Sequence, residues 1–149
     1  MKVSKYMTRK LITVTPEMSV KDAFLTMRTH RVRHLPVVEG DRLEGIISDR
    51  DLRRPRWADA LEDWTSYYQI DDDIAVKDVM TSNPEVLRTY DQILRAITIF
   101  REHRYGALPV LDKTGALVGI LSAQDLLLAL EELILEAKAA RKSKKKKKE

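Results

Sequence analysis

The chain has no cysteine, only five glycines, and no apolar run of the roughly 18 residues that a membrane-spanning helix needs. Without cysteine it has no disulfide, no thiolate metal site and no cysteine nucleophile, which fits a reducing compartment. Residues 1–6 carry no apolar stretch of signal-peptide length. We therefore expect a cytoplasmic protein with no membrane span.

Recognisable catalytic motifs are lacking as well. The sequence has no glycine-rich phosphate loop and no serine, histidine and aspartate in the context of a known catalytic motif. His30 and His103, each followed by an arginine, are expected to end helices, where imidazole can cap carbonyl groups. Two histidines are poor evidence for a metal site. The sequence predicts a protein that is not an enzyme, requires no cofactor and holds no metal.

The formal net charge of +4 comes from one end of the sequence. Apolar residues make up 44% of the chain and charged residues 34%, the balance of a globular protein. Seven of the nine residues at 141–149 are lysine or arginine and one is acidic, which leaves 20 basic and 22 acidic residues elsewhere. The basicity therefore belongs to a lysine-rich tail that we expect to be disordered, and nucleic acid is not the expected partner.

The two halves of the chain repeat one another. The offset is 73 residues before a one-residue insertion and 74 after it. The matching segments are Met7-Thr8 with Met80-Thr81, Leu35-Pro36-Val37 with Leu108-Pro109-Val110, Gly45-Ile46 with Gly119-Ile120, Ser48 with Ser122, and Asp51-Leu52 with Asp125-Leu126. The chain is therefore expected to hold two homologous units.

Both units have the same predicted order of elements, β-α-β-β-α. Each central helix is indicated by apolar residues at i, i+3, i+4 and i+7, beginning at Val20 and Ile93. Ser19 and Asp91 are the expected helix caps. The predicted strands are 11–14, 35–38 and 43–47 in the first unit, and 86–87, 108–111 and 116–121 in the second. Because one such unit buries little apolar surface, we expect an α+β fold in which the two units pack sheet against sheet.

Three motifs, each present twice and in the same order, resemble those of CBS domains. They are the opening Met-Thr, the apolar-Pro-Val strand, and Gly-Ile-x-Ser-x-x-Asp at 45–51 and 119–125. The tandem pair resembles a Bateman module, and "RHLPVV…GIISDRDL" looks most like the CBS pair of acetoin-utilisation-type regulatory proteins. The resemblance implies pseudo-two-fold symmetry and four segments: CBS motifs at 1–56 and 76–135, an aromatic-rich linker at 57–75, and a helix end with the lysine tail at 136–149.

The resemblance also implies a regulatory module that binds an adenine nucleotide or another adenosyl compound. Candidate ligands are AMP, ADP, ATP, S-adenosylmethionine and NAD-type compounds, or none. A carboxylate can accept two hydrogen bonds from ribose hydroxyls, and a hydroxyl at a helix start can reach a phosphate. The implied ligand-binding residues are Ser48, Asp51, Ser122, Asp125, Thr13, Thr15, Arg33, His34 and Ala107.

Each of these assignments has a structural alternative. Ser-x-x-Asp at a helix start is close to a capping box and can serve as a cap alone. Arg33 and His34 can form a solvated basic edge, and in the second unit they are replaced by Gly106 and Ala107. The aromatic residues of the linker (Trp57, Trp64, Tyr67 and Tyr68) can pin it to the core rather than stack on a base.

The last helix is expected to run from Ser122 to about Lys142, with an apolar face too wide for solvent. We therefore expect a homodimer formed through helices, together with an unidentified regulated protein. The alternative function is an adaptor for nucleic acid or protein that acts through this helix and the lysine tail without a small ligand.

Overall fold

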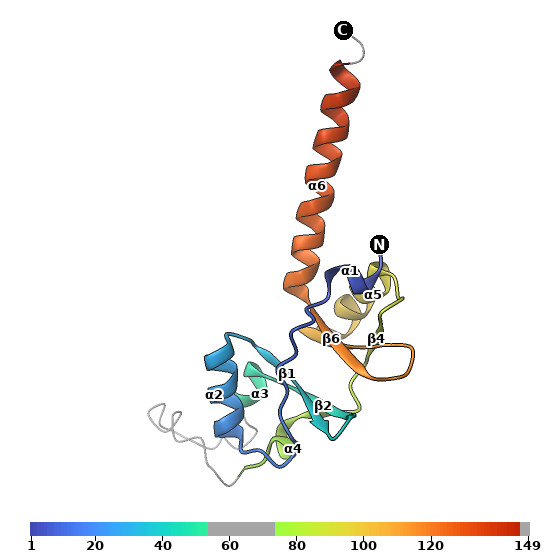
Figure 1. Ribbon diagram of the computed structural model, residues 1–149. Coiled ribbons are helices and arrows are strands. Elements are labelled where there is room, and N and C mark those ends of the chain that lie inside the picture. The colour runs from blue at the N-terminus through green and yellow to red at the C-terminus, as the bar shows by residue number, and fades with distance from the viewer. Residues whose placement is uncertain (54–73, 147–149) are drawn as a thin grey trace.

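The computed structural model describes residues 1–53 and 74–146 and has an α+β architecture (Figure 1). Two three-stranded sheets, ordered β1-β2-β3 and β4-β5-β6, each carry helices. The elements are α1 (Val3–Tyr6), α2 (Val20–His30), β1 (His34–Glu39), β2 (Arg42–Ser48), α3 (Asp49–Arg53), α4 (Val76–Val79), β3 (Thr81–Ser82), β4 (Leu87–Arg88), α5 (Ile93–His103), β5 (Ala107–Leu111), β6 (Leu117–Ser122) and α6 (Ala123–Lys146). The predicted α+β class and the duplication are confirmed.

Each half is built around one antiparallel hairpin followed directly by a helix. In the first half β1 pairs with β2 from His34↔Ser48 to Glu39↔Arg42, and Gly40 turns the chain at a φ of 60°. In the second half β5 pairs with β6 from Ala107↔Ser122 to Leu111↔Leu117. Both hairpins contain a register shift at the same repeat position. Each hairpin thus has a turn end and an open end, and α3 or α6 starts at the open end.

The opening segments of the two halves, around Met7-Thr8 and Met80-Thr81, are exchanged: each packs against the other half. This arrangement was not predicted from the sequence. β3 belongs to the second half but pairs with β2 of the first, and Thr8 bridges Ile120 of β6. Each Met-Thr segment lies close against the glycine of the other half. A Cβ on Gly45 would lie 2.6 Å from Met80 Sδ, and one on Gly119 would lie 2.8 Å from Met7 Sδ. The glycine of each Gly-Ile motif therefore makes room for the other half's Met-Thr segment.

The hydrophobic cores follow the same exchange. Val3 and Met7 are buried in the core of the second half, beside Leu108 and Leu121. Val76 is buried in the core of the first half, beside Leu35. Val3 and Val76 are repeat equivalents and occupy equivalent places in the two cores, as pseudo-two-fold symmetry requires. Each core is therefore completed by a short helix from the other half of the chain.

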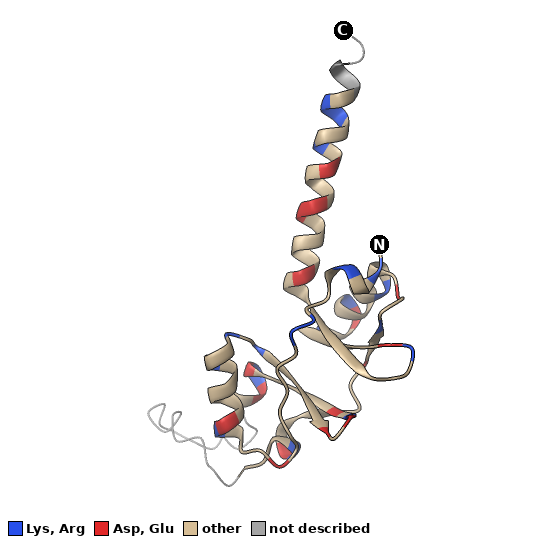
Figure 2. Cartoon of the chain, in the orientation of Figure 1, with Lys and Arg blue, Asp and Glu red and all other residues tan. Residues whose placement is uncertain are grey.

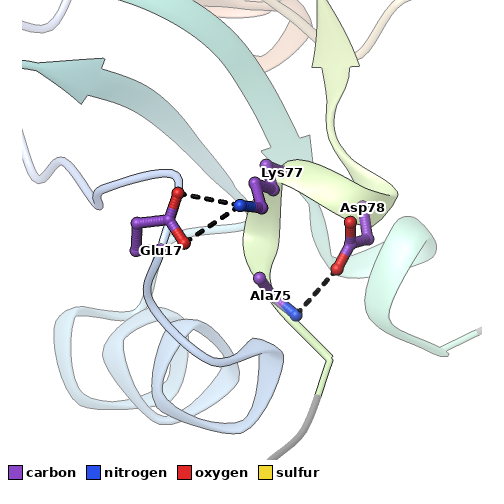
Figure 3. A network of polar contacts seen from close by, with 4 residues as sticks. All are labelled: Glu17, Ala75, Lys77 and Asp78. Carbon is purple, nitrogen blue, oxygen red and sulfur yellow. Dashed lines mark hydrogen bonds and ion pairs between the residues drawn. The ribbon is translucent and has the colours of Figure 1, made fainter.

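An ion pair joins the exchanged helix α4 to the first half, and a hydrogen bond closes the first turn of α4 itself (Figure 3). Lys77 Nζ lies 2.9 and 3.1 Å from the two carboxylate oxygens of Glu17, and Asp78 Oδ2 accepts a hydrogen bond from the Ala75 amide at 3.2 Å. The Glu17 carboxylate raises the pKa of Lys77. Because the Lys77–Glu17 pair is exposed, it orients α4 more than it stabilises the fold.

Some local predictions are confirmed and others are wrong. Ser19 caps α2, because its hydroxyl accepts from the Asp22 amide at 3.1 Å. Asp91 does not cap α5; Gln92 is the N-cap residue, and the Asp91 carboxylate accepts instead from the Arg88 amide at 2.8 Å. No strand forms at 11–14, where only Val14 bridges β1.

The final helix is longer than expected and projects from the body (Figure 1). It extends to Lys146 instead of about Lys142, since residues 123–146 contain no glycine or proline to end it. The part of the predicted tail at 147–149 and the linker aromatics Trp57, Trp64, Tyr67 and Tyr68 lie outside the described residues.

Candidate functional site

The two Ser-x-x-Asp segments form matching hydrogen-bonded boxes at the open ends of the hairpins. Asp51 Oδ2 accepts from the amide and the hydroxyl of Ser48 at 2.7 and 3.0 Å, and the Asp51 amide donates to Ser48 Oγ at 3.3 Å. The same three contacts join Asp125 and Ser122 at 2.6, 2.7 and 3.3 Å. The reciprocal geometry of a capping box is therefore present in both halves.

The second carboxylate oxygen distinguishes the two boxes. Asp125 Oδ1 lies 3.5 Å from the hydroxyl of Thr8, which the exchange brings from the opening of the chain. Within residues 1–53 and 74–146, Asp51 Oδ1 has no such contact. Thr8 was not among the residues predicted for the site, although its place in the repeated Met-Thr motif was a usable signal.

His34 lies where the two halves meet. It opens β1 opposite Ser48, and a Cβ added to Gly106 of the second half would collide with its imidazole ring. Burial lowers the pKa of His34, while the carboxylates of Asp49 and Asp51 act in the opposite direction. The glycine that replaces a basic residue in the second repeat therefore leaves space for the imidazole of the first.

Arg33 and Ala107 occupy different environments beside the boxes. The Arg33 side chain is exposed, and its carbonyl accepts from the Asp49 amide at the start of α3 at 2.9 Å. Ala107 is buried and pairs with Ser122 across β5 and β6. The structure thus gathers Arg33, His34, Ser48 and Asp51 at the open end of the first hairpin, and Ala107, Ser122 and Asp125 at that of the second.

Thr13 and Thr15 flank Val14, whose backbone runs beside β1. The Val14 amide donates to Pro36 O at 3.1 Å, and the Val38 amide donates to Val14 O at 2.9 Å. Both threonine side chains are exposed. The structure therefore places these two candidates along the β1 edge and not within the boxes.

A groove of about 500 Å³ lies at the opposite, turn end of the hairpins. Its lining residues are Asp41, Arg42, Leu43, Asn83, Pro84, Val86, Leu111 and Gly115. None of these is a predicted ligand-binding residue. Among the described residues there is no cluster of three acidic or histidine side chains suited to a metal, and no helix with the length and apolarity to cross a membrane.

Comparison with known proteins identifies the fold family. The CBS domain model matches residues 3–56 and 76–132. A CBS domain-containing protein of Dictyostelium discoideum is 32% identical over 130 residues, covering 84% of this chain and 88% of that protein. An inosine-5'-monophosphate dehydrogenase of Korarchaeum cryptofilum is 31% identical over 124 residues, but the match spans only 23% of that enzyme.

Solved structures agree with the family model. A crystal structure of CBSX2 in complex with AMP is 30% identical, with a TM-score of 0.72 over 89% of this chain and 97% of that one. CBSX2 from Arabidopsis thaliana, solved separately, gives the same TM-score at 29% identity. With both repeats matched by the family model and the paired fold shared with these structures, the chain belongs to the CBS domain family as a tandem pair.

Proposed function

We propose that this chain is a non-catalytic regulatory module that binds an adenosyl ligand at the open ends of its hairpins. The observation that carries the proposal is the pair of Ser-x-x-Asp boxes, each holding one carboxylate in a fixed direction beside the junction of the two halves. The AMP complex of CBSX2, which shares this fold at 30% identity, supports AMP as the first ligand to test.

In this proposal capping and ligand binding are compatible roles for one aspartate. The box occupies Oδ2 of Asp51 with two hydrogen bonds, which hold the carboxylate in place. Within residues 1–53 and 74–146 nothing contacts Oδ1, which would accept from a ribose hydroxyl. An ionised acceptor makes hydrogen bonds of roughly 1.5–3 kcal/mol, and its prior orientation reduces the entropy lost on binding. Asp125 would act in the same way, with Thr8 beside its Oδ1.

The remaining candidates would contact other parts of the ligand. Arg33 and His34 would approach the phosphate, with the Ser48 hydroxyl and the start of α3 nearby. The backbone around Thr13, Thr15 and Ala107 would read the edge of the adenine. ADP, ATP and other adenosyl compounds fit the same scheme, and no cofactor is needed for it.

The proposed partners are a second copy of this chain and a regulated protein. A module that catalyses nothing affects its target only if ligand binding changes its interaction with that target. The narrower resemblance to acetoin-utilisation regulatory proteins and the cytoplasmic location remain predictions from the sequence.

The proposal is tested by calorimetric titration of the purified chain with AMP, adenosine and GMP. Saturable binding of AMP, weaker binding of adenosine and no binding of GMP are expected, because adenine recognition and a phosphate contact are both required. The proposal fails if no adenosyl compound binds at millimolar concentration, or if GMP binds as tightly as AMP.

A further inference from the structure

The helices α2 and α5 both end at an arginine in the left-handed backbone conformation. Arg31, the C-cap residue of α2, has a φ of 55°, and its repeat equivalent Arg104, the C-cap residue of α5, has a φ of 54°. Within residues 1–53 and 74–146, Asn83 is the one further non-glycine residue with a positive φ. Glycine is usual at such a position, because a Cβ crowds the following carbonyl oxygen. The backbone therefore disfavours arginine at both repeat positions.

The hydrogen bonds that end the two helices use backbone atoms. The Val32 amide donates to Met27 O at 3.0 Å after α2, and the Arg104 amide donates to Phe100 O at 3.0 Å at the end of α5. A glycine at either C-cap would allow the same bonds without the crowding of a Cβ. Helix termination therefore does not explain why both positions hold an arginine.

Both arginine side chains are exposed, and in the part of the chain that the structure describes neither has a carboxylate partner. Exposed basic residues elsewhere do have one, as Lys77 does in Glu17 at 2.9 Å. The guanidinium groups of Arg31 and Arg104 can therefore bind an anion without first breaking an ion pair.

The two arginines lie close to the junction of the two halves. Arg31 precedes His34 by three residues, so their Cα atoms are at most about 11 Å apart. Arg104 precedes by two residues Gly106, where an added Cβ would collide with the His34 imidazole. Figure 2 shows the basic residues along the segment that joins α2 to β1. An anion that begins at His34 and extends outward thus approaches an arginine from each half.

We propose that Arg31 and Arg104 bind the outer phosphates of the ligand, so that the site takes an adenosine polyphosphate in preference to AMP. The inference rests on the proposed adenosyl site and narrows its class of ligand. Arg33 and His34 meet the first phosphate, and the next phosphates extend toward the two helix ends. Guanidinium groups make paired, charge-assisted hydrogen bonds to phosphate oxygens, which glycine cannot supply. A function of the side chain thus accounts for the disfavoured backbone at both caps.

The preference is tested by calorimetry with AMP and ATP on the wild type and on the Arg31→Gly/Arg104→Gly variant. The wild type should bind ATP at least about 10-fold more tightly than AMP, and the variant should lose about that factor for ATP alone. Asn83→Gly makes the same backbone change at the turn end and should alter neither affinity. Equal wild-type affinities for AMP and ATP, or equal losses for both in the variant, would overturn the proposal.

Thermal unfolding of the same variants gives a readout of opposite sign. Each arginine-to-glycine change should raise the melting temperature by roughly 1–3 °C, because it relieves the left-handed strain. Arg31→Lys keeps both the Cβ and the positive charge. It should melt like the wild type and lose less ATP affinity than Arg31→Gly. Lower melting temperatures in the glycine variants would show that the arginines support the fold, which would contradict the proposal.

Inorganic triphosphate separates a failure of this proposal from a failure of the proposed function. It carries the phosphate chain without adenosine, so binding to the wild type and not to the double glycine variant supports the arginine assignment even if AMP does not bind. If AMP binds and ATP binds more weakly, the adenosyl site stands and the polyphosphate preference is wrong. A wild type that binds neither ATP nor triphosphate would also overturn the preference.

Discussion

The two halves of the molecule share one capping box and differ in the residues around it. Both Ser-x-x-Asp boxes have the same three hydrogen bonds, with distances that agree within 0.3 Å. In the first half Arg33 and His34 stand beside the box, whereas the second half has Gly106 and Ala107 there. The repeated Ser-x-x-Asp box orients its aspartate carboxylate in the same way in both halves. The residues beside the box differ, so the proposed ligand would meet different chemical groups at the two boxes.

The halves also differ in the helix that starts at the box. The first half continues into α3, which the structure describes as far as Arg53, and the second into α6, which is described over 24 residues. Within one fold, the first half places basic side chains beside its box, and the second half continues into a helix with exposed apolar side chains. Four predictions test what the two halves share and how they differ, in order of decreasing effect.

The largest expected effect concerns the feature that the two halves share, their interlocked cores. Leu35 and Leu108 are repeat equivalents, and both are fully buried. Leu35→Ala and Leu108→Ala should each lower the free energy of unfolding by about 2–5 kcal/mol, because each leaves a cavity. Urea unfolding followed by circular dichroism should stay a single transition in both variants. A biphasic curve would mean that one half unfolds while the other remains folded.

The second prediction compares the two carboxylates. Asp51→Ala and Asp125→Ala should each weaken AMP binding by roughly 10–100-fold, since each removes an ionised hydrogen-bond acceptor. The loss should be larger for Asp51, which lies beside the basic side chains. Asp41→Ala, at the turn end, is the calorimetric control. If Asp41→Ala weakens binding and the other two do not, the ligand occupies the groove at the turn end.

The third prediction isolates the phosphate contact. Arg33→Ala should weaken AMP binding by about 3–10-fold, a moderate effect because the guanidinium is exposed. Adenosine, which has no phosphate, should bind Arg33→Ala and wild type equally well. Arg42→Ala changes an arginine at the turn end and should alter neither affinity. An equal loss for AMP and adenosine would show that Arg33 supports the fold of the site rather than the phosphate.

The smallest expected effect is the pH dependence that His34 gives to the first half. Burial lowers the folded-state pKa of His34 below its ordinary value of 6.5, so the unfolded chain binds the proton more readily. Its contribution to stability is therefore fully present above about pH 6.5 and is lost as the pH falls through the folded-state pKa.

His34→Gln should remove that part of the pH dependence. The difference in melting temperature between pH 7.5 and pH 5.5 should be smaller in His34→Gln than in wild type. His103→Gln changes an exposed histidine and should leave the difference unaltered. If the two variants respond alike, the packing of His34 against Gly106 contributes nothing to the pH dependence.

Most of the fold was predictable because its elements depend on local pattern. The helix starting at Val20 and the paired strands of each hairpin follow from apolar spacing and from the turn between them. The strand expected at 11–14 fails because its apolar residues only bridge β1 at Val14. A short apolar run does not by itself show whether its backbone will pair with a neighbouring strand along its whole length.

The exchange of the opening segments was not predictable from local pattern. Met7-Thr8 and Met80-Thr81 repeat visibly in the sequence, but nothing in them tells which half they join. The same limit applied to the site: the capping boxes followed from Ser-x-x-Asp, whereas the contact of Thr8 with Asp125 and that of His34 with Gly106 are long-range contacts. Local sequence spacing therefore predicts the capping boxes of this site, whereas the contacts between the two halves depend on tertiary packing.

The exchange has a further consequence for how the chain can be divided. Each half supplies from its own sequence the valine, Val3 or Val76, that completes the core of the other half. Cutting the peptide between residues 53 and 74 would yield two complementing fragments, each with an unfilled pocket when alone. Reassociation would refill both pockets at once, so the fragments bind each other by the same contacts that fold the intact chain. We therefore expect the tandem repeat to unfold as one cooperative unit and neither half to fold as a separate domain.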